Sequence, residues 1–224
     1  MKESLPFTTL LSFPLLSSLP PEDLEWLQNR LFLQSVVKDE VLLIEGEMTP
    51  RLYFVLDGWL KVEKTSSEGR QQTIRYVGPG EVLNELVVFS QSINPATIQA
   101  MEEAHLFYLT KDDIDTLIGR NWDFYRAVIA SLSIRIQHLL DLVESLSLYS
   151  VDQRLAQYLL EESIHNVFIR QSWKTQTEIA ARLGTVLDVV NRNLQNFARL
   201  GLIELQRDRI TIIDRQGLED IASQ

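Results

Sequence analysis

Two short helices separated by a single glycine constrain the C-terminal third of the chain more than any other feature. Thr175 is followed three residues later by Glu178, a capping box that opens a helix ended by Gly184. Thr185 and Asp188 form a further capping signal directly after this glycine, with Thr185 expected as the N-cap. Two helices joined so tightly predict a helix-turn-helix.

The second of these helices is amphipathic. Val190, Leu194 and Phe197 recur at spacings of 4 and 3 residues and predict a buried side. The side chains expected on the opposite side are Leu187, Asp188, Asn191, Arg192 and Gln195. Asn, Gln and Arg can pair bidentately with base edges in the major groove, whereas a merely solvated helix would favour Glu and Lys over Asn. This side therefore predicts DNA reading. A polar surface helix without a special role is the alternative, in which Asp188 serves only as a cap.

A two-stranded hairpin is predicted directly after the helix-turn-helix. Residues 203–206 and 209–213 alternate in polarity around Arg207 and Asp208, a pattern typical of a wing. Arg207 and Arg209 at its tip are expected to lie against DNA phosphates. Three polar residues at the starts of the two helices complete the predicted DNA-binding set: Lys174, Gln176 and Thr185. A winged helix-turn-helix is a more specific prediction than either motif alone.

The net charge of −10 counts against nucleic-acid binding at first sight. Residues 171–224, however, contain seven basic and seven acidic residues. The predicted DNA-binding part is therefore neutral, and the acidic excess lies upstream of it. We expect DNA binding with a modest bulk electrostatic contribution. Docking of the winged helix onto a protein partner is the alternative that the acidic balance keeps open.

The sequence pattern of the N-terminal half is typical of short strands separated by glycine turns. The runs that predict strands are 41–44, 52–56, 59–63, 72–77, 96–101 and 104–109, after a short helix near residues 20–27. Asp57-Gly58 and Gly78-Pro79-Gly80 are turn signals between them. Close spacing of this kind indicates an antiparallel roll of the jelly-roll type, a double-stranded β-helix. With the helices that follow it, the chain is predicted to be α+β.

A heptad seam connects these two parts. Its residues, separated by 3, 4, 3, 4 and 3 positions, are Ile129, Leu132, Ile136, Leu139, Val143 and Leu146. So strict a spacing is typical of a helix paired with a second helix, and it predicts a dimer interface. The alternative is an amphipathic helix lying on its own domain, for which Ile134, Leu140 and Leu142 would broaden the apolar stripe.

Composition and missing motifs exclude several kinds of site. The chain has no cysteine, which excludes disulfides, thiolate metal sites, cysteine-ligated iron–sulfur clusters and thiol switches. His105, His138 and His165 show no metal-ligand spacing, so no metal site is predicted. Common signatures of hydrolases, nucleotide-binding enzymes and metalloproteases are absent, and we predict no catalysis. No apolar run reaches about 18 residues, so we expect a cytoplasmic protein without a membrane partner.

With these parts in order, the chain resembles the CRP/FNR superfamily of bacterial transcription regulators over nearly its whole length. The stretches that carry the resemblance are VLLIEGE at 41–47, YFVLDG at 53–58, GEVLNEL at 80–86 and EIAARLGT at the start of 178–192. The third is similar to the family's phosphate-binding cassette, and the fourth to its DNA-reading motif. The domains implied are a cyclic-nucleotide-binding-like β-roll sensor at 1–120, a dimerisation helix at 121–149 and a winged helix-turn-helix at 150–224.

The resemblance also implies partners. CRP/FNR regulators are homodimers, and the resemblance implies that two recognition helices enter successive major grooves of a palindromic operator in double-stranded DNA. RNA polymerase is a further partner if the regulator activates transcription.

The cassette departs from that of members that bind cyclic AMP. Glu85 matches their ribose-binding glutamate, but Asn84 replaces the glycine before it. Asn94 and Pro95 replace the arginine and the hydroxyl residue that hold the phosphate. An anion there lacks its charge-assisted bidentate partner, and proline supplies no backbone donor. We therefore predict that the protein does not bind cyclic AMP at signalling concentrations.

The signal itself is left open by the sequence. Leu139 and Leu140 stand where cyclic-AMP-binding members place the two polar residues that meet the adenine. The polar groups expected near the roll's pocket are Arg75, Asn84, Glu85, Asn94 and Thr97. A small apolar or acidic effector of the 2-oxoglutarate type stays possible, as does a packed pocket with no effector at all. No cofactor is predicted, although a histidine could still serve as the axial ligand of a haem.

The DNA-reading helix departs from the family as well. Where the family often has an arginine, an acidic residue and a second arginine, this chain has Leu187, Asp188 and Arg192. Leu187 removes a guanine contact and offers an apolar contact to a thymine methyl group. We expect the target sequence to differ from the common family palindrome.

Overall fold

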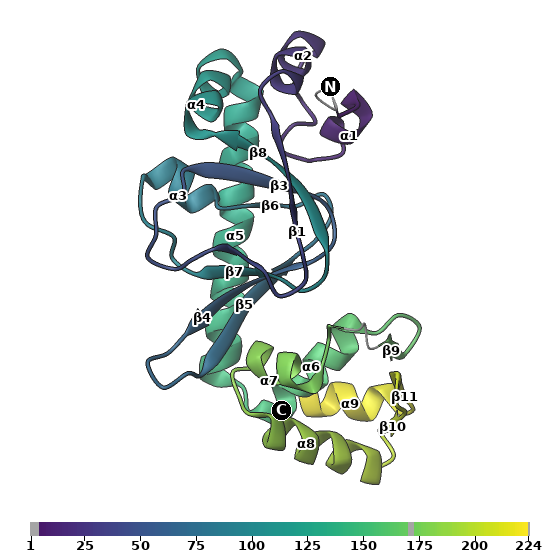
Figure 1. Cartoon of the computed structure of the whole chain (residues 1–224). Coiled ribbons are helices and arrows are strands. Elements are labelled where there is room, and N and C mark those ends of the chain that lie inside the picture. The colour runs from purple at the N-terminus through teal and green to yellow at the C-terminus, as the bar shows by residue number, and fades with distance from the viewer. Residues whose placement is uncertain (1–4, 170–172, 224) are drawn as a thin grey trace. The chain divides into compact units, whose positions relative to one another are not determined.

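The structure, a computed structural model, describes residues 5–169 and 173–223. The chain divides into two compact units, Met1–Lys64 with Arg75–Leu139 and Thr65–Ile74 with Leu140–Gln224. Figure 1 labels the helices and strands of both units.

The helices and strands follow one another along the chain as the change in periodicity predicts. The helices are α1 (Phe7–Leu11), α2 (Pro21–Gln28), α3 (Glu85–Ser90), α4 (Lys111–Arg120), α5 (Trp122–Leu148), α6 (Val151–Glu162), α7 (Gln176–Arg182), α8 (Leu187–Arg199) and α9 (Arg215–Ala222). The strands are β1 (Phe32–Val36), β2 (Val41–Leu43), β3 (Arg51–Asp57), β4 (Leu60–Thr65), β5 (Gln71–Val77), β6 (Val82–Leu83), β7 (Thr97–Ala100), β8 (Ala104–Thr110), β9 (Val167–Ile169), β10 (Ile203–Leu205) and β11 (Arg209–Ile212).

The strands of the N-terminal half form two four-stranded sheets, ordered β1-β8-β3-β6 and β2-β7-β4-β5. The pairings β1–β8, β3–β8 and β4–β7 are all antiparallel, with Tyr53 opposite Tyr108 and Lys61 opposite Gln99. The antiparallel roll predicted from the sequence is confirmed. Strands β1 and β6 were not predicted, because Phe32 and Leu33 of β1 are exposed and β6 is only two residues long.

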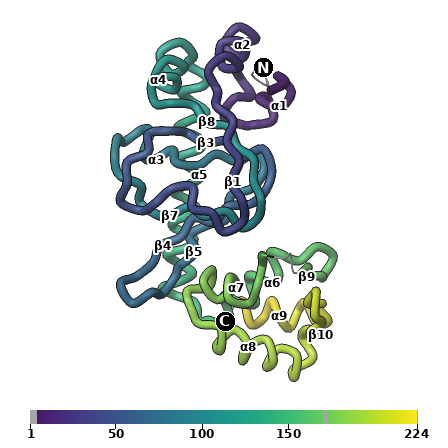
Figure 2. Tube along the Cα trace, viewed as in Figure 1, coloured from purple at the N-terminus to yellow at the C-terminus, as the bar shows by residue number. Residues whose placement is uncertain are grey.

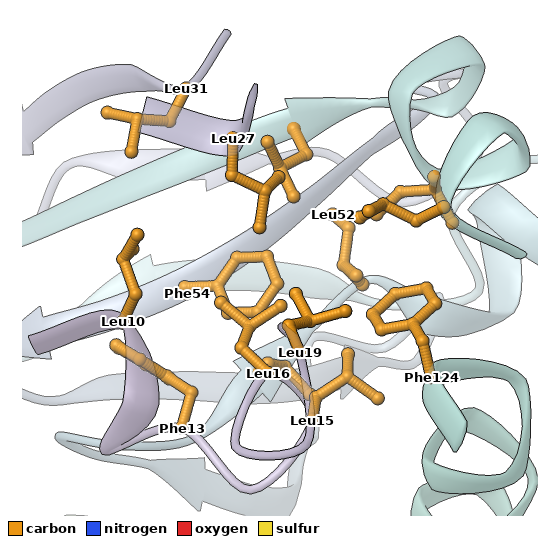
Figure 3. Packing of buried hydrophobic residues seen from close by; sticks show 14 of the residues in the cluster. Leu10, Phe13, Leu15, Leu16, Leu19, Leu27, Leu31, Leu52, Phe54 and Phe124 are labelled. Carbon is orange, nitrogen blue, oxygen red and sulfur yellow. The ribbon is translucent and has the colours of Figure 1, made fainter. Parts of the chain in front are cut away.

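The apolar segment at the N-terminus closes one end of this roll, where α1, α2 and α4 gather (Figure 1). Leu16 and Leu19 lie close to Phe54 of β3 in the core (Figure 3). The ring of Phe13 stands edge-on to Phe54 and Phe107 at 5.3 Å from each, and those two rings stack at 4.5 Å. Offset and edge-on aromatic pairs of this kind stabilise a core beyond the area that they bury.

Helix α5 begins in the same core and then becomes exposed. Phe124 and Val128 are buried, and Leu132 packs against the core from the edge. Beyond these residues, much of the 27-residue helix carries exposed apolar side chains. Among the described residues, no helix is both long enough and apolar enough to cross a membrane.

The second unit contains α6 to α9 around an apolar core, and its chain path can be followed in Figure 2. Leu155 and Leu159 of α6 pack with Phe168 and with Val190 of α8. Strands β10 and β11 form the predicted hairpin, with Ile203 opposite Ile212. The prediction of a two-stranded wing was incomplete, because β9 pairs antiparallel with β11 and gives a three-stranded sheet.

Candidate functional site

Helix α7 is fixed at both ends by local chemistry. The hydroxyl of Thr175 accepts a hydrogen bond from the N–H of Glu178 at 3.2 Å, as an N-cap should. The helix ends at Arg182, and Gly184 adopts φ +63°, a left-handed conformation that favours glycine. The predicted start and stop of this helix are confirmed.

The prediction of Thr185 as the N-cap of α8 was wrong. The N-cap is Val186, and no side chain caps this end. Thr185 belongs instead to the end of α7, because its N–H bonds to the carbonyl of Ala180 at 2.9 Å. This bond closes a Schellman-type end around Gly184. The hydroxyl of Thr185 is thus one residue too early to cap α8.

The two sides of α8 differ as the sequence predicts. Val190, Leu194 and Phe197 are at most 1% exposed and anchor the helix in the second unit's core. The exposed polar side chains on the opposite side are Asp188, Arg192, Gln195 and Arg199. Asn191 is half-buried, and Leu187 is 38% exposed at the start of the helix beside the more exposed Val186.

Arg199 was missed by the sequence reasoning. It lies seven residues after Arg192, which places both on one stripe of a helix with 3.6 residues per turn. Its guanidinium donates to Asn196 Oδ1 at 2.9 Å and is otherwise exposed. The seven-residue spacing was the available signal.

The remaining predicted DNA-binding residues differ in their exposure and in whether their side chains already have a partner. Arg207 is exposed at the tip between β10 and β11. Arg209 is also exposed but donates to Asp208 at 3.1 Å, and this bond holds the pKa of Asp208 below its ordinary value. Lys174 forms an ion pair with Glu162 and is mostly covered, and Gln176 and Thr185 are half-buried. Of the wing and helix-start residues, Arg207 is thus the most available for a phosphate.

We call residues 80–86, the stretch similar to the phosphate-binding cassette, the cassette turn. It leads into α3 and contains a cluster of ion pairs. Arg75 donates to Glu81 Oε1 at 3.2 Å and to the carbonyl of Val82 at 2.9 Å. Arg135, from α5, donates through Nε to Glu85 Oε1 at 3.3 Å. Glu85 itself is buried. Burial, followed by the nearby charge of Arg135, lowers the pKa of Arg75 to about 10.

The other residues predicted near the pocket are bonded to backbone groups. Asn84 adopts φ +73° and donates to the carbonyls of Thr49 and Arg51. Asn94, 1% exposed, donates to the carbonyl of Ile44 at 2.9 Å. The hydroxyl of Thr97 accepts from the N–H of Glu45 at 3.2 Å. Leu139 and Leu140 are exposed on α5.

Two family descriptions match the chain in the order of its parts. Residues 33–121 match the cyclic nucleotide-binding domain, and residues 153–221 match the Crp-like helix-turn-helix domain. The second match takes in α7, α8 and the hairpin that follows them. Together the two matches cover well over half of the chain. The chain belongs to the CRP/FNR superfamily.

Relatives of this CRP/FNR regulator are similar over most of their length. A protein named cyclic AMP receptor protein, from Thermus thermophilus, is 27% identical over 93% of this chain and 96% of its own. The anaerobic regulatory protein of Haemophilus influenzae is 26% identical over 91% of this chain and 82% of its own. A solved structure from Eubacterium rectale, assigned to the same family, has a TM-score of 0.76 at 25% identity, covering 95% of this chain and 99% of that one.

The family membership gives the chain's general role. It is a CRP/FNR-type transcription regulator with a helix-turn-helix DNA-binding domain, and the matched domains are those of regulators and not of enzymes. Within it, Asn94 and Pro95 lie in the region matched to the cyclic nucleotide-binding domain. The sequence reasoning missed Glu81, which lies in the same region, and Arg135 of α5, which lies outside it. Both are bonded to members of the predicted pocket.

Proposed function

We propose that this CRP/FNR regulator binds palindromic double-stranded DNA as a homodimer, with α8 of each copy in a major groove, and that its roll does not take cyclic AMP. The observation that carries the proposal is the exposed stripe of Asp188, Arg192 and Gln195 on α8, opposite a fully buried side. Such a helix is held rigidly while it offers guanidinium and amide groups to base edges.

The exposed seam of α5 supports the dimer. Ile129 and Leu139 are 47% and 49% exposed, and Ile136 and Val143 are 60% and 61% exposed. Heptad spacing places all four on one stripe. A continuous apolar stripe of this kind is unfavourable in water and is the surface that a second α5 would cover. We therefore assign the seam from Ile129 to Leu146 to a second copy of the chain.

The chemistry of the cassette supports the exclusion of cyclic AMP. Asn94 stands where an arginine would meet the phosphate, and its amide already donates to the carbonyl of Ile44. Glu85, which would meet the ribose, is paired with Arg135. We therefore do not extend to this chain the cyclic AMP binding that the name of one relative implies. Micromolar binding of cyclic AMP in calorimetry would contradict this part of the proposal.

The experiment that tests DNA binding is a binding-site selection with the full-length protein, followed by affinity measurements at several salt concentrations. We expect a palindromic consensus and an affinity that falls as salt rises, since phosphate contacts release counterions. If the winged helix instead docks onto a protein partner, the selection should give no consensus and the protein should not bind promoter DNA. The absence of a consensus or the absence of DNA binding would each contradict the proposal.

The domain limits and partners follow the same proposal. We assign residues 1–120 to the roll, 121–149 to the dimerisation helix and 150–224 to the DNA-binding domain. RNA polymerase is the further partner that we propose if the regulator activates transcription, and the cytoplasm is the compartment in which it would act on DNA.

A further inference from the structure

Arg135 of α5 makes three separate contacts with the cassette turn, one from each guanidinium nitrogen. Nε lies 3.3 Å from Glu85 Oε1, Nη1 lies 3.5 Å from Glu81 Oε1, and Nη2 donates to the carbonyl of Val82 at 3.2 Å. The planar guanidinium offers donors in a fixed fork, so one side chain can hold three acceptors at once. We call Arg75, Glu81, Glu85, Arg135 and the Val82 carbonyl the cassette node.

The node is balanced in charge. It contains two guanidiniums and two carboxylates, and Arg75 shares both Glu81 Oε1 and the Val82 carbonyl with Arg135. The second oxygen of Glu81 accepts the N–H of Gly78 at 2.8 Å. Two neighbouring cations are tolerated in a partly buried place only when carboxylates neutralise them. The positive charge of each guanidinium is therefore already neutralised by a carboxylate of the chain, and neither arginine is left to bind an added anion.

A second buried ion pair of the same unit joins two residues of a single strand. Lys61 and Glu63, both on β4 and both at most 5% exposed, lie 2.9 Å apart. The buried cation of β4 is thus paired with a carboxylate of its own strand, and it offers no ready counter-ion for a phosphate or a dicarboxylate.

We propose that Arg135 is a positioning residue, which ties α5 to the cassette turn through the chain's own carboxylates and so allows DNA binding without an effector. Glu81 and Glu85 already form ion pairs with the two guanidiniums that an anionic effector would need. This inference rests on the proposed DNA-binding function. The competing outcome is an anion that displaces the two carboxylates from Arg75 and Arg135.

The first arm of the test uses ligands. Full-length protein is dialysed, checked by native mass spectrometry for bound small molecules, and titrated against its selected operator by fluorescence anisotropy. Cyclic AMP and 2-oxoglutarate are then added separately at millimolar concentration. We expect the ligand-free protein to bind, with its affinity unchanged within about two-fold by either probe. Binding that is lost on removing a ligand, or tightened ten-fold by a probe, overturns the inference.

The second arm uses Arg135→Gln, Arg135→Lys and the control Arg126→Gln, which changes an exposed arginine of the same helix outside the node. We expect Arg135→Gln to weaken operator binding at least ten-fold and to speed hydrogen exchange in β6 and α3. Arg135→Lys keeps the charge without the fork and should restore part of both. Arg126→Gln should match the parent in both measurements.

The possible failures are distinguishable. If Arg135→Gln binds the operator like the parent, or if Arg135→Lys is no better than Arg135→Gln, the positioning role is wrong. If Arg135→Gln does not fold, the ligand arm on the parent protein still decides. A parent that binds DNA only with 2-oxoglutarate contradicts this inference alone. One that needs cyclic AMP contradicts in addition the cyclic AMP part of the proposed function, and one that selects no operator under any condition contradicts its DNA-binding part.

Discussion

Arg75 and Arg135 come from β5 and α5 but contact the same two oxygens, Glu81 Oε1 and the carbonyl of Val82. Both donate to the carbonyl, whereas only Arg75 donates to Glu81 Oε1, with which Arg135 forms an ion pair at 3.5 Å. Burial, followed by the charge of Arg135, lowers the pKa of Arg75 to about 10, because both disfavour a charged guanidinium there. The arrangement is maintained because Glu81 and Glu85 supply one carboxylate for each guanidinium. Through Arg135, α5 thus contacts both side chains and backbone of the roll.

Replacing Arg192 by alanine should abolish specific DNA binding. Arg192 is the exposed arginine near the middle of the α8 stripe, and a bidentate base contact contributes about 1–3 kcal/mol, roughly 5- to 150-fold in affinity, in each half-site. The measurement is anisotropy with the selected operator and with a scrambled duplex. Arg215→Ala, which changes an exposed arginine on α9, is the matched control and should bind as the parent does. An Arg192→Ala variant that still prefers the operator would contradict the assignment.

Introducing a carboxylate into the α5 seam should dissociate the dimer. Ile136→Glu would place two like charges against one another in an apolar interface, with an expected rise in the dimer dissociation constant of roughly ten-fold or more. Sedimentation velocity over a range of concentrations measures it. His138→Glu adds the same charge on the same helix but off the seam, so it should leave the dimer intact. Equal behaviour of the two variants would show that the seam is not the interface.

The sequence was most informative where the signal is local. The ends of α7, the buried side of α8 and the hairpin that follows depend on side chains a few residues apart, and all three were predicted. The cap of α8 was misplaced by one residue, since Thr185 suits an N-cap equally well but is held by the end of α7. Which of two adjacent helix ends takes such a residue depends on backbone geometry and not on residue type.

Long-range contacts could not be predicted in the same way. Arg135 lies 50 residues after Glu85, and nothing in its own stretch of sequence marks it as different from another polar residue on a helix. Lys174 was predicted to face DNA, but its ammonium forms an ion pair with Glu162 at the end of α6. Strand β9 is three residues long and is defined only by its pairing with β11. In each case the partner, and not the local pattern, decides the role.

The pH dependence of stability should report on His105. Its Nδ1 lies 2.7 Å from Asp57 Oδ1, and this hydrogen bond, with the charge of the carboxylate, raises the pKa of His105 above 6.5. The folded chain therefore favours the protonated imidazole. This stabilisation is fully present below the unfolded pKa of about 6.5 and is lost as the pH rises through the higher folded value.

His105→Gln should therefore destabilise the chain at acidic pH and have little effect at alkaline pH, with a small difference because the pair is exposed. Urea unfolding at several pH values measures this, and an NMR titration of the imidazole gives the pKa itself. His138→Gln, which changes an exposed histidine on α5, should retain the parent's pH dependence. An NMR pKa of His105 at or below 6.5 would contradict the raised value.

Leu187 should change which base is preferred at one position of each half-site. It is 38% exposed at the start of α8, next to Val186 at 56%, so two apolar side chains precede the polar stripe. Apolar side chains read the C5-methyl of thymine in the major groove. A binding-site selection with Leu187→Arg should give a consensus with guanine at that position. The same consensus as the parent would contradict the role of Leu187.

The methyl contact can be tested without changing the protein's hydrogen bonds to DNA. Replacing the thymines of the selected operator by deoxyuracil removes only the C5-methyl groups. If Leu187 covers one of them, the parent should lose about four-fold in affinity for each methyl, given about 0.8 kcal/mol per buried methylene-sized group. Leu187→Ala should bind both duplexes with nearly equal affinity, because it no longer reaches the methyl. A parent that binds the two duplexes equally well would show that Leu187 faces no thymine, while leaving the contacts of Arg192 in place.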